Sequence, residues 1–249
     1  MDASLRQIDF LDAELTLVDR SIAEQVLAWP EVRRIMTIPG MGSTTAAAIM
    51  AAIGDIRRFP TPSHLVGYLG LDPRVRQSGS APARHGAISK QGSSEARHLL
   101  VEAAWAATKT PGPLRAFGER IKARRGTNVA TVAVARKLAV LCWHLLSGDR
   151  NYVYARPSLV REKIRRLEHR AGADRHTGRR DGPERVFATP AQRRLEREVG
   201  LDAELAYRRF VSDLQVAKGK GAGAITGARI SSALKGQAAR QEQAPDPAL

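Results

Sequence analysis

The 249-residue sequence contains a single cysteine, Cys142. One cysteine excludes a disulfide within the chain and a cysteine-rich zinc site. Its neighbours are apolar, so we expect the thiol to pack inside a helix rather than to react. No apolar stretch approaches the roughly 20 residues that span a bilayer, and the first residues lack the basic-then-apolar order of a signal peptide. These absences predict a cytoplasmic protein that does not enter a membrane.

Acidic residues are the scarcer charged type: 25 Asp and Glu stand against 40 Lys and Arg, a formal net charge of +15. An excess of positive charge favours a polyanionic partner, because neutralising phosphates releases counterions. Nucleic acid is the first prediction, and an anionic membrane surface is the competing one. No group of Asp and Glu has the spacing or the strand context of a metal site, so we expect no metal to be bound.

Residues 1–29 are expected to form an amphipathic, coiled-coil-like helix. Apolar residues recur there every three or four positions, as one helix face requires; they are Leu5, Ile8, Leu11, Leu15, Val18, Ile22 and Val26. The stripe covers about three heptads, which suits a dimer seam or a docked helix. We therefore expect a homo-oligomer joined through this helix, with docking on the rest of the chain as the alternative.

The run from Ile38 to Ala46, Ile-Pro-Gly-Met-Gly-Ser-Thr-Thr-Ala, predicts a helix-hairpin-helix. Gly42 permits a tight reversal, and Ser43 or Thr44 is expected to cap the second helix. In such a motif backbone N–H groups point outward together and bind a phosphate oxygen. Glycines there let a nucleic-acid backbone approach closely. The residues predicted to contact DNA are Pro39, Gly40, Gly42, Ser43 and Thr44.

A basic segment rich in glycine and serine follows at 74–90, which we expect to be a loop or a loose hairpin. Ser78 stands there among arginines with no evident structural task. A serine hydroxyl is a weak nucleophile until something activates it, and nearby cations favour the alkoxide and stabilise a phosphoryl transition state. The cations predicted for this role and for DNA contact are Arg74, Arg76, Arg84, Lys90 and Arg97.

Further helices are expected, and the fold class predicted from them is all-α. The expected ranges are 64–70, a long helix capped by 91–95, 113–124, 127–147, 157–169 and 190–214. The helix at 127–147 is almost wholly apolar and is expected to be the buried centre. We divide the chain into a coiled-coil-like helix at 1–29, a compact helical domain at 30–155, and a basic, partly disordered extension at 156–249.

Five short motifs follow one another in the middle of the chain: Thr37–Gly42, Tyr68–Arg74, Gln77–Gly79, His85–Gly92 and Arg97–Ala104. In this order they resemble the C-terminal transposase domain of the IS110 insertion-sequence family, over residues 35–155. The resemblance implies a DNA recombinase that moves its element with a structured guide RNA. It also implies that a serine of this loop acts together with an acidic RuvC-like domain, and that the preceding helix joins protomers in a coiled coil.

The resemblance assigns the nucleophile to Ser78, which precedes Gly79; Ser80 and Ser89 are the alternatives. A phosphoserine link to DNA conserves the energy of the broken strand, so rejoining needs no nucleoside triphosphate. The alternative is a flexible loop that only binds phosphate.

The acidic domain of the family, whose carboxylates hold Mg²⁺, has no counterpart in this sequence. We therefore expect the chain to bind no cofactor itself and to be a truncated family member with impaired activity; a misassigned start and a split protein are the alternatives. Two other functions remain open: a noncatalytic helix-hairpin-helix DNA-binding protein, and a base-excision glycosylase with Asp55 or Asp72 as its acid.

Overall fold

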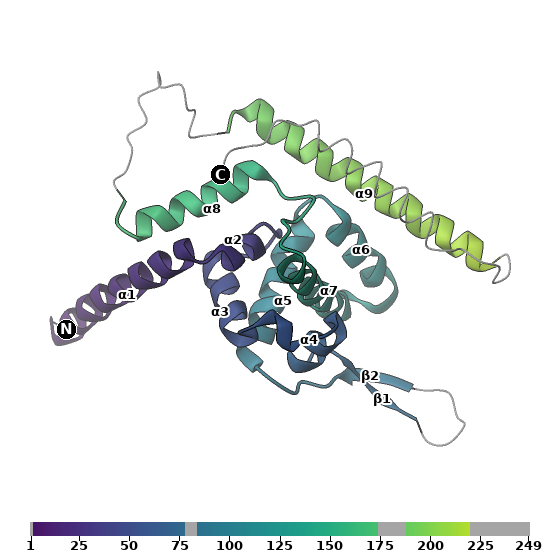
Figure 1. Ribbon diagram of the computed structural model, residues 1–249, viewed down its shortest axis with the longest axis horizontal. Helices are drawn as coiled ribbons and strands as arrows, with labels where there is room; N and C mark the ends of the chain where they lie inside the picture. The colour runs from purple at the N-terminus through teal and green to yellow at the C-terminus, as the bar shows by residue number, and fades with distance from the viewer. Residues whose placement is uncertain (1, 78–83, 174–187, 220–249) are drawn as a thin grey trace. The chain divides into compact units, whose positions relative to one another are not determined.

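The computed structural model describes residues 2–77, 84–173 and 188–219, and these residues form a predominantly helical fold, as predicted (Figure 1). The helices are α1 (Asp2–Ala28), α2 (Pro30–Met36), α3 (Ser43–Ile53), α4 (Pro62–Tyr68), α5 (Ser94–Lys109), α6 (Pro113–Arg125), α7 (Thr127–Ser147), α8 (Pro157–Arg170) and α9 (Pro190–Gly219), with a short 3-10 turn at Ile56–Arg58. Two strands, β1 (Pro73–Arg76) and β2 (Arg84–Ile88), pair between α4 and α5.

The helix starts follow the local sequence. Five of the described helices, α2, α4, α6, α8 and α9, begin with proline, which has no N–H to leave unpaired at that position. The Ser93 hydroxyl accepts from the Ala96 N–H and caps α5. Thr189 and Gln192 bond each other's backbone N–H at the start of α9, a capping box. The predicted helix boundaries near 113, 127, 157 and 190 are thereby confirmed.

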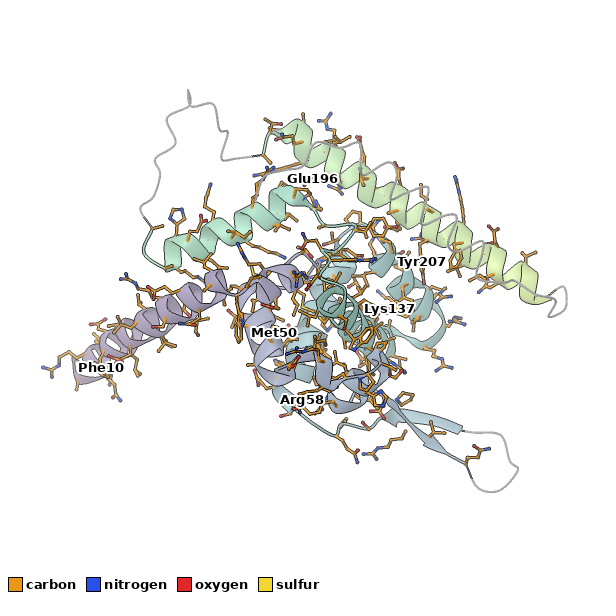
Figure 2. The ribbon with its side chains drawn as sticks, in the orientation of Figure 1. Phe10, Met50, Arg58, Lys137, Glu196 and Tyr207 are labelled. Atoms are coloured by element: carbon orange, nitrogen blue, oxygen red, sulfur yellow. The ribbon has the colours of Figure 1, made fainter. Side chains whose placement is uncertain are left out.

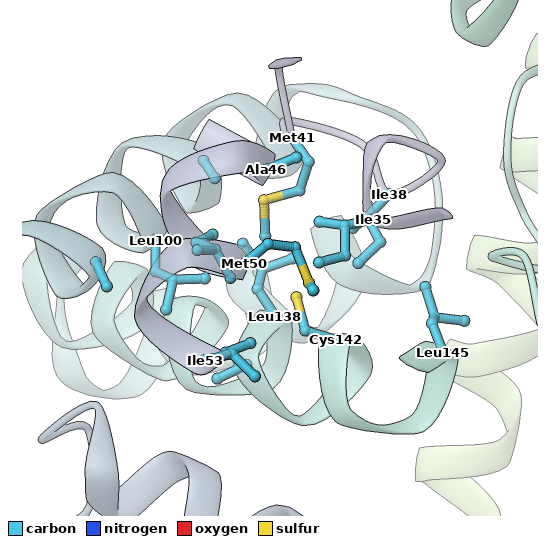
Figure 3. Packing of buried hydrophobic residues seen from close by; sticks show 14 of the residues in the cluster. Ile35, Ile38, Met41, Ala46, Met50, Ile53, Leu100, Leu138, Cys142 and Leu145 are labelled. Atoms are coloured by element: carbon cyan, nitrogen blue, oxygen red, sulfur yellow. The ribbon is translucent and has the colours of Figure 1, made fainter. Parts of the chain in front are cut away.

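Helix α7 is the core helix, as its apolar sequence predicted. Figure 3 shows Leu138, Cys142 and Leu145 of α7 packing beside residues of α3 and of the segment before it. Cys142 is buried, as predicted, and burial raises the pKa of its thiol to about 12. Burial stabilises such side chains by about 1.5–3 kcal/mol each.

One expectation about α7 was wrong. By length and composition its 21 residues are apolar enough to cross a membrane, and among the described residues it is the single helix that passes this test. Half of its apolar window is buried inside the protein, because α7 packs against α4, α5 and α6. That burial is what a core helix of a folded domain requires.

Helix α1 is docked at one end. Ala23 and Val26, near its C-terminal end, are buried, and the helix contacts α2, α3 and α8. The apolar stripe nearer the N-terminus remains exposed, including Leu11 and Leu15, and Phe10 stands off the ribbon in Figure 2. Docking therefore buries the C-terminal end of the predicted apolar stripe, and the rest of the stripe is exposed.

The chain divides into two compact units, Met1–Arg208 and Arg209–Leu249. Within the first unit, α9 is attached by two glutamates on one face. Glu196, labelled in Figure 2, accepts from the backbone N–H and the hydroxyl of Ser158 at the start of α8. Glu204 accepts from the Gly112 N–H at the start of α6. Between the two glutamates, a Cβ on Gly200 would lie 2.9 Å from the Pro111 carbonyl oxygen.

Candidate nucleic-acid interface

The turn between α2 and α3 is packed against α5. Gly40 has φ +85°, and a Cβ there would lie 2.2 Å from the Ala103 carbonyl oxygen and 2.9 Å from the Ala107 nitrogen. Our explanation of this glycine as room for a nucleic-acid backbone was therefore wrong. Gly40 is required because the turn crosses the backbone of α5 inside the protein.

Gly42 differs from Gly40. No atom lies within 4 Å of the Cβ position at Gly42, so the space beside it is open. Gly42 is the N-cap of α3, and no side chain caps this helix. The prediction that Ser43 or Thr44 acts as the cap was therefore wrong, because α3 begins one residue earlier than that role needs. The first N–H groups of α3 are left without a capping side chain, as an anion-binding turn requires.

The α2–α3 turn is fixed by two contacts from later in the chain. The Lys163 ammonium of α8 donates to the carbonyl oxygens of Met36 and Met41, both at 2.7 Å. The Thr37 hydroxyl donates to the Arg34 carbonyl at 2.6 Å and accepts from the Tyr152 N–H at 2.9 Å. Burial lowers the pKa of Lys163 to about 8. The turn is consequently held in one conformation.

The segment expected as a loop or loose hairpin contains an antiparallel β-ribbon. Strands β1 and β2 pair Pro73 with Ile88, Val75 with His85 and Arg76 with Arg84, with a bulge between Pro73 and Val75. Ser78, Gly79 and Ser80 lie outside the described residues, in the connection between the two strands. We call the connection at 77–83, which contains Ser78, the serine loop; it joins the two strands of a short ribbon that projects from the helical domain (Figure 1).

The base of this ribbon is a close backbone crossing, which we call the hairpin root and define as residues 70–72 and 89–92. A Cβ on Gly70 would lie 2.0 Å from the Gln91 carbonyl oxygen, and one on Gly92 would lie 1.8 Å from that of Tyr68. Both glycines have positive φ. Both glycines stand in the sequence motifs, which by themselves assign them no role. They lie at similar distances before and after the serine loop, and this spacing is the signal that could have identified them.

Side chains lock the hairpin root. The Ser89 hydroxyl donates to Asp72 Oδ1 at 2.5 Å. The Ser89 N–H donates to the Asp72 carbonyl, and the Arg74 guanidinium donates to the Ser89 carbonyl at 3.0 Å. Ser89, the third candidate for the nucleophile, thus has a structural bond partner. Asp72, one of the two glycosylase candidates, is engaged in the same bond.

The other predicted contacts fall into three groups. Lys90, in the hairpin root, is exposed with φ 58°, and Arg74, on β1 just after the root, is exposed as well. Arg97 is half-buried and donates to the Leu69 carbonyl at 3.4 Å, so it supports the root from α5. Arg76 and Arg84 occupy paired backbone positions next to the serine loop.

Neither aspartate predicted for a glycosylase is free. Asp55 bonds the Arg57 N–H and its guanidinium, and these hydrogen bonds lower its pKa. Next to this pair, the Arg58 guanidinium lies 5.6 Å from the ring centroids of both Phe59 and Tyr68 and forms a cation–π contact with each. The sequence did not predict these contacts. Within the described ranges, no three His, Cys, Asp or Glu side chains gather as metal ligands.

Comparison with known proteins gives a consistent result. Residues 32–119 match the family described as "Transposase IS116/IS110/IS902 family". The chain is 34% identical over 151 residues to a "Probable family 20 transposase" of Pseudomonas aeruginosa, covering 59% of this chain and 44% of that protein. It is 37% identical over 130 residues to the "Transposase for insertion sequence element IS1111A" of Coxiella burnetii, covering 49% and 34%.

A third relative is the "Pilin gene-inverting protein" of Moraxella bovis, 28% identical over 144 residues, with 55% of this chain and 45% of that protein covered. The chain therefore spans less than half the length of these curated relatives. The matched residues 32–119 contain the α2–α3 turn, the hairpin root, both strands and the serine loop.

Proposed function

From the premise that residues 32–119 form a domain of the IS116/IS110/IS902 transposase family, we propose that this chain binds DNA and acts in DNA transposition. The β1–β2 ribbon carries a serine to a DNA strand, and Ser78 is the nucleophile. The observation that carries this proposal is the hairpin root, where the backbone crossing at Gly70 and Gly92 and the Asp72–Ser89 bond tie together the base of the ribbon that leads to the serine loop.

Rigid placement matters because strand transfer depends on positioning. Holding a nucleophile in line with its target can contribute about 7–11 kcal/mol of the barrier. In the proposed step, the Ser78 oxygen bonds to phosphorus, a deoxyribose oxygen leaves, and the serine proton passes to a base. Reversal by another strand's hydroxyl restores the phosphodiester and releases the serine.

The charge along the ribbon supports a phosphate partner. Its register pairs the backbone positions of Arg76 and Arg84, and two basic residues at paired positions suit a polyanionic partner. Lys90 and Arg74 add exposed positive charge at the root. The α2–α3 turn supplies a second phosphate contact through Gly42, Ser43 and Thr44, in the helix-hairpin-helix manner.

The partners and location belong to the same proposal. Exposed Leu5, Ile8 and Leu15 of α1 support a coiled coil between two copies of the chain. A structured guide RNA remains an expectation from the family, and the cytoplasm is the proposed location. Magnesium would need a set of carboxylates, and the described residues bring no such set together. No step proposed for this chain runs through a metal.

The binding half of the proposal is tested by the salt dependence of affinity for duplex DNA. Each neutralised phosphate contributes a slope of about −0.9 in log K against log salt. Lys90→Gln should reduce the magnitude of the slope by about 0.9, whereas Lys137→Gln on α7 serves as an exposed control cation. An unchanged slope in Lys90→Gln would remove the ribbon from the interface.

The chemical half is tested by trapping the protein on nicked DNA, in the presence of the acidic domain of a relative, and mapping the covalent attachment. Attachment at Ser78 supports the assignment. Attachment at another residue contradicts it. DNA binding without any attachment favours the second candidate function, a noncatalytic DNA-binding module, for which the uncapped start of α3 is the specific observation.

A further inference from the structure

A small slot lies where α5, α6 and α7 meet, away from the hairpin root. Its volume is about 250 Å³. The lining residues that matter here are Trp105, Lys109, Gly118, Glu119, Lys122 and Thr127. We call it the Trp105 slot. Pockets that bury a drug-sized ligand measure about 300–1,000 Å³, so this slot suits a single flat ring rather than a large ligand.

The slot exists because small residues let the helices approach at its floor. A Cβ on Gly118 would lie 3.0 Å from Thr108 Cγ2 and 3.3 Å from Val134 Cγ2. Gly118 itself is buried. Ala130 and Thr131 of α7 complete the floor. The recess is therefore part of the packing of three helices.

Trp105 is the wall that offers binding chemistry. Its side chain is 41% exposed, although a tryptophan in a helical domain normally buries more of its large ring. Among the hydrogen bonds of the described residues, none uses Trp105 Nε1. An open indole face is a stacking platform for any planar ring.

The rim of the slot is positive. Lys109 lies one helical turn after Trp105, and Lys122 stands across from it on α6; both are exposed. In the part of the chain that the structure describes, neither lysine forms an ion pair. The acid of the lining, Glu119, is paired with Arg208. Two uncompensated cations therefore flank the aromatic wall.

We propose that the Trp105 slot binds one unpaired base of a single-stranded nucleic acid, stacked on Trp105, with the flanking phosphates on Lys109 and Lys122. Stacking combined with backbone contacts is how proteins hold single strands of any sequence. The proposal rests on the proposed function for the presence of a strand. Helix α5 connects the two places: Ser94 follows the hairpin root, and Trp105 lies about 17 Å farther along the helix.

The test is a fluorescence titration of the whole chain with a thymidine strand about twelve nucleotides long, compared with a strand of equal charge in which abasic sites replace the bases. Trp105→Ala should weaken binding of the thymidine strand about five- to 150-fold and leave the abasic strand unaffected. Trp105→Phe, which keeps a ring, should retain most of the affinity. Trp29→Ala is the matched control, since Trp29 is 45% exposed at the start of α2.

The lysines provide an independent test that leaves Trp105 and the floor of the slot unchanged. The double variant Lys109→Gln/Lys122→Gln should reduce the magnitude of the slope of log K against log salt for the thymidine strand by about 1.4, the value for two phosphates of a single strand. If Trp105→Ala fails to fold, the lysine double variant tests the slot by itself. A uridine strand run in parallel assigns the strand type, and tighter binding of either strand through Trp105 supports the slot.

Equal affinity of wild type and Trp105→Ala for both the thymidine and the uridine strand overturns the slot, as does a salt slope that is unchanged for both strands in the lysine variant. If duplex binding persists in that case, the proposed function stands and only the slot fails. If neither duplex nor single strand binds, both proposals fail together.

Discussion

Arg115 of α6 and the buried Glu204 of α9 form a part-buried ion pair although 89 residues separate them. Arg115 Nε lies 2.8 Å and its Nη2 2.7 Å from Glu204 Oε2. The same carboxylate accepts from the Gly112 N–H, and its other oxygen accepts from Arg208. Glu204 is 4% exposed. The first part of α9 is thereby held to α6 by a carboxylate that accepts hydrogen bonds on both oxygens.

Removing this carboxylate should destabilise the protein. Glu204→Ala leaves the Arg115 charge and the Gly112 N–H without their partner, and we expect the free energy of unfolding to fall by about 2–4 kcal/mol. Glu119→Ala removes the exposed acid that also pairs with Arg208 and should cost about 0–1 kcal/mol. Urea unfolding measures both. Equal losses in the two variants would mean that α9 is not held by Glu204.

The same residue predicts an acid-sensitive stability. Burial raises the pKa of Glu204, but hydrogen bonds from Arg208, Arg115 and the Gly112 N–H outweigh burial and hold the pKa below the ordinary 4.5. A lowered folded-state pKa contributes stability above pH 4.5, and this stability is lost as the pH falls through the folded value.

Glu204→Gln should therefore flatten the loss of stability below pH 4.5, measured by thermal unfolding across an acid series. Glu198→Gln, on the exposed face of α9, should keep the wild-type profile. If Glu204→Gln retains the full acid dependence, other carboxylates cause it.

The attachment of α9 shows what the sequence could not predict. Thr189 and Pro190 marked the start of the helix, because caps and N-terminal prolines are local signals. The faces of the helix gave no such signal. Its apolar residues Leu195, Val199 and Leu205 are exposed, whereas Glu196, Gly200 and Glu204 face the domain. Apolar patterning assigns the wrong face when a helix docks through carboxylates that cap other helices.

The glycines of the hairpin root should tolerate no side chain. Gly92→Ala would place a Cβ 1.8 Å from the Tyr68 carbonyl oxygen at a positive φ, and we expect a loss of at least about 2 kcal/mol of unfolding free energy. Gly67→Ala in α4 meets no atom within 4 Å and should be neutral or stabilising by up to about 1 kcal/mol. Thermal unfolding compares them. Normal stability in Gly92→Ala would contradict the crossing.

The two glycines of the α2–α3 turn should separate stability from DNA binding. Gly40→Ala meets the backbone of α5 and should unfold the domain. Gly42→Ala enters open space and should cost no more than about 1 kcal/mol of stability. If a phosphate sits on the start of α3, the added methyl should weaken duplex binding about tenfold or more, as for a lost charged hydrogen bond. Unchanged affinity in a folded Gly42→Ala protein would remove this turn from the interface.

The site was predictable in part for physical reasons. Glycine, proline and basic residues mark turns and phosphate contacts locally, which located the α2–α3 turn and the serine loop. The separate tasks of Gly40 and Gly42 depend on α5, about 60 residues later, so no local pattern distinguishes them. The Asp72–Ser89 bond likewise joins residues 17 apart, and it appears only once β1 and β2 are paired.

The most direct measurement asks whether Ser78 lies at a DNA strand. Because the single native thiol, Cys142, is buried, Ser78→Cys presents one reactive thiol, and bound duplex DNA with a thiol tethered to a backbone phosphate can form a disulfide with it. We predict rapid cross-linking at Ser78→Cys and little at the matched control Lys137→Cys. If the DNA is bound but cross-links to Lys137→Cys and not to Ser78→Cys, Ser78 does not lie at a DNA strand and the proposal is contradicted.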